Sequence, residues 1–185
     1  MKPLIFAALL LLAACKEDAP VPLPVALTEA STGYFCQMDL SGHPGPKAQI
    51  HLASFPGKPL FFSQVRDAVA YLRLPEQVDV VTATYVSDMG AAPSWDDPGA
   101  LNWIAADQAV YVVGSSAKGG MDAPELVPFG DPAKAQAFAA AQGGTVMTLA
   151  QIPATAINTV PTTAAPGDEA DYAARLRALS SSTGG

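Results

Sequence analysis

The pattern of hydrophobic and polar positions predicts short β-strands separated by loops rich in Gly and Pro, with one helix in each half of the chain. In the first half, Val65, Val69 and Leu72 recur at helical spacing. Ser63 precedes them as a suitable N-cap, which predicts a helix over 63–74. Strands are expected around it at Tyr34–Met38, Ala48–Ala53, Leu60–Phe62 and Val78–Val86. This order predicts a ββαβ unit with one additional strand.

The second half repeats this order of elements. Asp131 is expected to cap a helix that begins at Pro132 and ends before Gly143. Strands are expected at Ala109–Val113, Glu125–Phe129 and Thr145–Leu149. The repeated order predicts an internal duplication. We therefore expect an α+β fold of two tandem homologous ββαβ units, over residues 33–88 and 89–158.

The amino terminus has the pattern of an export signal over residues 1–14. A positively charged start precedes an apolar run, Leu4–Ala14, that is too short to span a bilayer. Leu12-Ala13-Ala14-Cys15 resembles a bacterial lipobox, which implies cleavage before Cys15 and a lipid on its thiol. An ordinary signal peptide is the alternative. Lys16 after the lipidated Cys resembles lipoproteins of the outer membrane, so we expect a periplasmic protein anchored in its inner leaflet.

Two flanking segments are expected to add little to the core. Residues 15–32 are rich in Pro and predict an extended, lipid-anchored tether. Residues 159–185 are dominated by Thr, Ala, Pro, Gly and Ser and predict a flexible tail. A short helix near Asp168–Leu179 is expected within that tail.

Composition excludes several classes of function. The net charge is −7, which argues against a nucleic-acid partner because such proteins present basic surfaces to phosphates. Two Cys and two His are too few for a disulfide framework or a zinc cluster. The chain also lacks a G-x-S-x-G elbow and an H-E-x-x-H helix, and we expect no enzyme.

Lipidation of Cys15 would leave Cys36 as the only thiol of the mature chain. Such a thiol can be a small buried hydrophobe, half of an intermolecular disulfide, or a metal ligand. On a strand, Cys36 and Met38 would face the same side, and thiolate plus thioether is a soft donor pair that favours Cu(I). The alternative is that both side chains simply pack in the core.

The remaining candidate ligands lie in loops. Met121 follows two Gly residues and Met89 follows the end of a predicted strand, so neither is readily explained as core filler. His43 lies in another loop and could supply an imidazole. The sequence therefore predicts a Cu(I) site of Cys36, Met38 and Met121, which Met89 or His43 completes.

Several segments, in a fixed order, resemble the NosL family of lipoprotein copper chaperones for nitrous oxide reductase assembly. They are Cys36-Gln37-Met38, His43–Ile50, Tyr85–Met89, Ala109–Ser115, Gly119–Glu125 and Val127–Phe129. The resemblance implies a C-x-M copper motif at Cys36 and Met38 and a further ligand at Met121. It also implies paired ββαβ units similar to those of the mercury lyase MerB. Gln37 and Asp122 depart from the Gly that the family often has at these positions.

The resemblance further implies partners. Cu(I) would pass to NosD, the periplasmic protein of the NosDFY transporter, and from there to nitrous oxide reductase. A rival hypothesis is an adaptor that docks to the transporter without binding metal. A MerB-like lyase is a second rival, which the single thiol of the mature chain disfavours.

Overall fold

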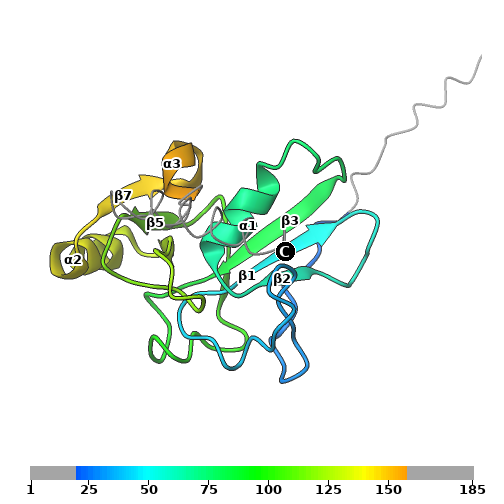
Figure 1. The fold of residues 1–185 in the computed structure, drawn as a ribbon, viewed down its shortest axis with the longest axis horizontal. Helices are drawn as coiled ribbons and strands as arrows, with labels where there is room; N and C mark the ends of the chain where they lie inside the picture. The colour runs from blue at the N-terminus through cyan, green and yellow to red at the C-terminus, as the bar shows by residue number, and fades with distance from the viewer. Residues whose placement is uncertain (1–19, 158–185) are drawn as a thin grey trace, which may run out of the picture.

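The computed structural model describes residues 20–157, which form two antiparallel sheets with helices packed against them (Figure 1). The first sheet has four strands. In spatial order they are β2 (Leu60–Phe62), β1 (Ala48–Leu52), β3 (Val81–Ser87) and β4 (Trp103–Ala105). Helix α1 (Val65–Leu72) connects β2 to β3. The strands expected around residues 48–53, 60–62 and 78–86 are confirmed.

The second sheet has three strands and follows the same plan. In spatial order they are β6 (Val127–Phe129), β5 (Val110–Val113) and β7 (Thr145–Thr148). Helix α2 (Pro132–Gln142) connects β6 to β7, and η1 (Leu149–Gln151) and α3 (Ala154–Ile157) follow. In each sheet the earliest strand is flanked by the next strand and by the strand after the helix. The α+β class is confirmed, whereas a common origin of the two halves stays a prediction.

Helix α2 begins and ends as its sequence predicts. The Asp131 carboxylate accepts a hydrogen bond from the backbone N–H of Ala133 at 2.8 Å, and Pro132 occupies the first turn. Gly143 ends the helix with a φ of 77°, in the left-handed region that favours Gly.

One hydrophobic core joins the two halves. Buried side chains of the first sheet and α1, such as Ile50 and Val65, belong to the same cluster as Tyr111 and Leu126 of the second half. Strand β4 comes after the predicted boundary at residue 88 and yet pairs with β3 in the first sheet. The two predicted units are therefore not separate in space, because a strand of the second segment completes the sheet of the first.

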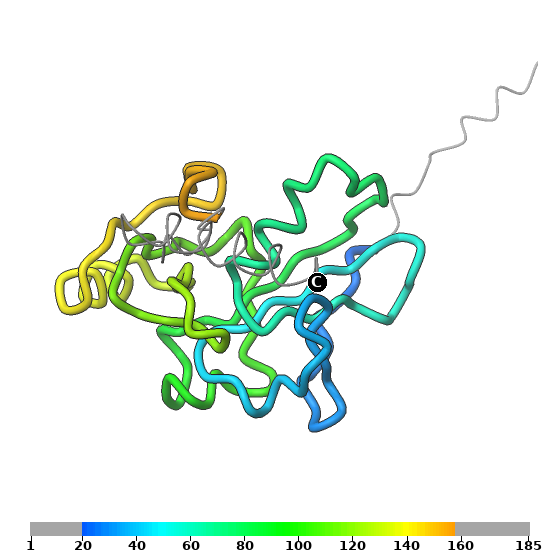
Figure 2. Tube along the Cα trace, in the orientation of Figure 1, coloured from blue at the N-terminus to red at the C-terminus, as the bar shows by residue number. Residues whose placement is uncertain are grey.

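Residues 20–32 were expected to form a tether without packed structure, and the structure differs. The Gln49 side chain exchanges two hydrogen bonds, at 2.8 and 2.9 Å, with the backbone of Val25. Tyr85 Oη donates to the Pro22 oxygen at 2.7 Å. These contacts fasten the segment along the first sheet, where Figure 2 shows it in blue.

The export signal over residues 1–14, the lipidated Cys15, the tail over 159–185 and its expected helix all lie outside the described residues. Within residues 20–157, none of the helices has the length and apolar character needed to cross a membrane.

Candidate metal centre

Cys36 and Met38 lie on a tight turn, so the expected strand Tyr34–Met38 is wrong. The Gly33 N–H donates to the Met38 oxygen at 2.9 Å, and the Gln37 N–H donates to the Gly33 oxygen at 2.8 Å. Gln37 has a φ of 54°, which an extended strand cannot accommodate. The two sulfur residues are therefore neighbours on one closed turn rather than on a pleated strand.

Backbone and aromatic contacts hold this turn, the Cys36 turn (residues 33–38), on the edge of the first sheet. The Tyr34 N–H donates to the Phe61 oxygen of β2 at 2.7 Å. The ring of Phe35 packs on Phe62 with centroids 5.4 Å apart, and the ring of Tyr34 packs on Tyr71 of α1 at the same separation. Aromatic pairs of this kind contribute more stability than their buried area alone would give.

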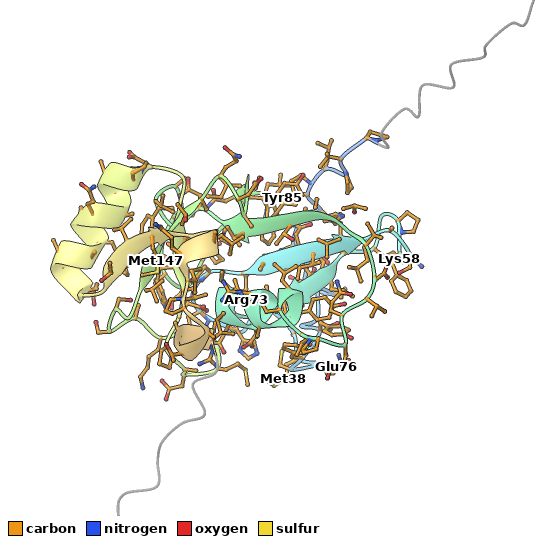
Figure 3. All side chains as sticks on the ribbon, turned by 90° about the horizontal axis from the view of Figure 1, so that it is seen from above. Met38, Lys58, Arg73, Glu76, Tyr85 and Met147 are labelled. Atoms are coloured by element: carbon orange, nitrogen blue, oxygen red, sulfur yellow. The ribbon has the colours of Figure 1, made fainter. Side chains whose placement is uncertain are left out.

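The two sulfur-bearing residues of the Cys36 turn are partly exposed. Met38 is 42% exposed, and Figure 3 shows it at the edge of the molecule. Cys36 is half-buried and has no disulfide partner among residues 20–157. Its Sγ lies directly over Gly33, where a Cβ would overlap it. Gly33 thus makes room for the thiol.

Met121 lies at the tip of a second closed loop, the Met121 loop (residues 118–124). The Gly119 N–H donates to the Ala123 oxygen and the Asp122 N–H donates to the Gly119 oxygen, both at 2.9 Å. An exposed ion pair of 2.9 Å joins Lys118 and Asp122 across the loop. Met121 is 43% exposed, so this thioether also reaches the solvent.

His43 packs against the Met121 loop. A Cβ built on Gly120 would lie 2.5 Å from the His43 Cβ and 3.1 Å from its Cγ. The His43 Nε2 atom is shielded from solvent and has no hydrogen-bond partner within the part of the chain that the structure describes. An unpartnered ring nitrogen is costly to bury and is a common metal ligand. The structure thus brings together His43 and the loop of Met121.

Lys47 holds the backbone of His43 in place. Its buried Nζ donates to the backbone oxygens of His43 at 2.7 Å and of Gly45 at 2.5 Å. Burial lowers the pKa of Lys47 to about 8, and the negative charge of Glu125 opposes this shift.

Glu125 lies beneath the Met121 loop, at the amino end of α1. Its Oε1 accepts hydrogen bonds from the backbone N–H groups of Arg66 at 3.0 Å and Leu126 at 2.8 Å. Complete burial raises the pKa of this carboxyl to about 8. The expectation that Ser63 caps α1 is wrong, because Gln64 occupies the N-cap position without a side-chain cap and the carboxyl of Glu125 satisfies the helix N–H instead.

Ser63 and Gln64 connect the two sulfur-bearing loops. A Cβ on Gly33 would lie 3.8 Å from the Ser63 nitrogen, and one on Gly119 would overlap the Gln64 side chain. The Cys36 turn and the Met121 loop therefore rest on consecutive residues at the start of α1. Within residues 20–157, the structure contains no group of three or more His, Cys, Asp and Glu side chains that could hold a metal ion.

Met89 is partly buried in a hydrophobic environment. It packs against the smaller hydrophobic cluster that includes Val112, Val127 and Phe129, and its N–H donates to the Pro128 oxygen at 2.9 Å. This packing favours His43 over Met89 as the residue that completes the predicted ligand set.

Sequence reasoning missed Glu125 and Gln64. The only local signal is a charged residue that directly precedes the apolar run from Leu126 to Phe129. A carboxyl next to such a run enters the core with it, and no local signal in the sequence places it against a helix 59 residues away.

Comparisons with known proteins agree with this architecture. A model of the NosL family matches residues 24–157. The chain is 54% identical to the copper-binding lipoprotein NosL of Achromobacter cycloclastes over 98% of this chain and 96% of that protein. It is 33% identical to the protein of the same name from Stutzerimonas stutzeri over 74% of this chain and 70% of that protein. The crystal structure of the copper chaperone NosL from Shewanella denitrificans matches with a TM-score of 0.67 and 30% identity, covering 74% of this chain and 99% of that chain.

Proposed function

The chain belongs to the NosL family, and we propose that it is a metallochaperone that binds Cu(I) through sulfur and delivers it to a partner protein. The proposed ligands are Cys36, Met38 and Met121, and His43 completes the set. One observation carries this assignment. Two exposed sulfur-bearing loops contact Ser63 and Gln64, the consecutive residues that precede α1, and His43, whose Nε2 has no partner among the described residues, packs against one of these loops.

The chemistry of these donors suits Cu(I). A thiolate with thioethers is a soft ligand set, which disfavours Mg²⁺ and Ca²⁺ and suits Cu(I) better than zinc. Few ligands on exposed loops allow a Met, His or Cys of a partner to replace them one at a time. The ion can then move between proteins without release into the solvent, and no catalytic turnover is needed.

The family membership supports the remaining proposals on location and partners. The two curated relatives are named copper-binding lipoproteins, and we propose that Cys15 is lipidated and anchors the chain in the periplasm, at the inner leaflet of the outer membrane. We propose NosD of the NosDFY transporter as the recipient of Cu(I) and the copper centres of nitrous oxide reductase as its destination.

An anaerobic Cu(I) titration of the soluble protein against a colorimetric chelator tests this function. We expect one-to-one binding that weakens strongly in Cys36→Ser, Met38→Leu and Met121→Leu, and to a smaller degree in His43→Ala. Met89→Leu is the matched control, because that side chain packs in a hydrophobic cluster. Unchanged binding in the first three variants would refute the ligand set, and undetectable binding in the wild type would favour the metal-free adaptor.

A further inference from the structure

Glu125 lies where three parts of the fold meet. It lies two residues before β6. Its Oε1 accepts a hydrogen bond from the Arg66 N–H in the first turn of α1, and its own N–H donates to the oxygen of Ala117, which precedes the Met121 loop. Glu125 thus connects the helix, through its buried carboxyl, with the chain that leads into the Met121 loop, through its backbone.

The Met121 loop approaches this carboxyl at Gly119. A Cβ at that position would overlap both Glu125 Oε2 and the Gln64 side chain, so only Gly allows the backbone to come so close. Gln64 Nε2 also reaches the Ala123 oxygen of the same loop at 3.5 Å. The loop is otherwise held by the packing of His43 on Gly120, by its own backbone hydrogen bonds and by an exposed ion pair, which contributes little.

Two polar atoms beneath the loop have no partner among the residues that the structure describes. They are Glu125 Oε2 and Gln64 Oε1, both on completely buried side chains. Buried polar atoms of this kind are uncommon and often mark a place where the structure serves a function. The charged groups that act on the carboxyl are Arg66 and Asp67 of α1 and Lys47 before β1.

We propose that Glu125 is a positioning residue of the copper site, whose buried carboxyl fixes the Met121 loop to the amino end of α1 and so holds Met121 in place for the ion. This inference rests on the proposed role of Met121 as a ligand. Outer residues that orient metal ligands typically change affinity by about 10- to 100-fold when they are replaced.

The test follows each Met residue separately. Protein labelled with ¹³C at the Met methyl groups is titrated with Cu(I) without oxygen, and the methyl signals of Met38, Met121 and Met89 are recorded. In the wild type we expect the first two to shift and Met89 to stay. In Glu125→Ala we expect Met38 to shift as before, Met121 to respond weakly, and the affinity to fall by about 10- to 100-fold.

Two further variants separate positioning from general destabilisation. Glu125→Gln keeps an oxygen that can accept from Arg66 and Leu126, so we expect it to restore the Met121 response. Gly119→Ala keeps the carboxyl but pushes the loop away from it, so we expect it to lose that response even if Glu125→Ala fails to fold. Gly42→Ala is the matched control, since a Cβ there meets nothing within 4 Å.

The outcomes distinguish this inference from the proposed function. A wild-type Met121 signal that ignores Cu(I) refutes Met121 as a ligand, and the positioning role fails with it. A Met121 signal that shifts equally in the wild type, Glu125→Ala and Gly119→Ala, at equal affinity, leaves the proposed function intact and refutes the positioning role alone.

Discussion

Replacing Gly120 by Ala is expected to destabilise the protein, because the new methyl group would meet the side chain of His43. The added Cβ would lie 2.5 Å from the His43 Cβ, 3.1 Å from its Cγ and 3.3 Å from the Pro44 oxygen. His43 cannot easily retreat, since the buried Lys47 Nζ binds its backbone oxygen at 2.7 Å.

Forcing a methyl group into a packed contact typically costs about 1–3 kcal/mol of unfolding free energy. For a chain of this size each kcal/mol lowers the melting temperature by about 2–4 °C. A Gly→Ala change also removes flexibility from the unfolded chain, which stabilises by about 0.4–1 kcal/mol. The matched control Gly42→Ala shares that gain and adds a methyl group with nothing within 4 Å. The difference between the two variants therefore isolates the contact with His43.

Urea unfolding followed by circular dichroism measures this difference on the soluble protein. We expect Gly120→Ala to be less stable than Gly42→Ala by at least about 1 kcal/mol, and to bind Cu(I) more weakly because His43 moves. Equal stability of the two variants, within the ~0.5 kcal/mol typical of surface changes, would refute the packing of His43 on the Met121 loop.

Three further predictions concern Glu125, Tyr111 and Phe35. The pKa of Glu125 is raised from 4.5 to about 8, so stability should fall as pH rises between these values, with a slope of up to about 1.4 kcal/mol per pH unit. Glu125→Gln should flatten that slope in urea unfolding from pH 5 to 8, and an unchanged slope would contradict the burial. Tyr111→Phe removes a buried 2.7 Å hydrogen bond to the Ala106 oxygen and should cost about 1–2 kcal/mol with unchanged copper affinity. Phe35→Ala should loosen the Cys36 turn and weaken Cu(I) binding in the chelator titration, whereas wild-type affinity would show that its ring packing is dispensable.

The sequence predicts an element well where its signals are local. Helix α2 is marked by Asp131 at its cap, Pro132 in its first turn and Gly143 at its end, and each performs that role. Strand β1 alternates apolar and polar residues and strand β5 is an apolar run, and both lie where the pattern places them. In these segments the physical cause of the structure lies within a few residues.

Prediction fails where a distant partner decides the structure. Ser63 is a residue type that often caps helices, but the carboxyl of Glu125, from a distant part of the chain, accepts the hydrogen bond from a backbone N–H in the first turn of α1. The strand expected at Tyr34–Met38 is replaced by a turn that is closed by Gly33 and attached to β2. Strand β4 has only three residues and forms by pairing with β3, so its own sequence carries little signal.

For the candidate ligands, too, the sequence predicts one part of the site and only the structure decides the other. Their residue types predict a soft metal such as Cu(I), and the structure places Met38 and Met121 at the surface. The sequence does not decide whether His43 or Met89 is the additional ligand, because both residues are predicted to lie outside the helices and strands. Only the packing of Met89 into a hydrophobic cluster and the unpartnered Nε2 of His43 distinguish them.

A crystal structure of the soluble protein loaded with Cu(I), with anomalous data at the copper absorption edge, tests the central claim most directly. We expect a single copper peak bonded to Sγ of Cys36 and to Sδ of Met38 and Met121, with Nε2 of His43 close by. A copper peak bonded to other residues, with the Cys36 turn and the Met121 loop unchanged from the arrangement described above, would contradict the proposed site.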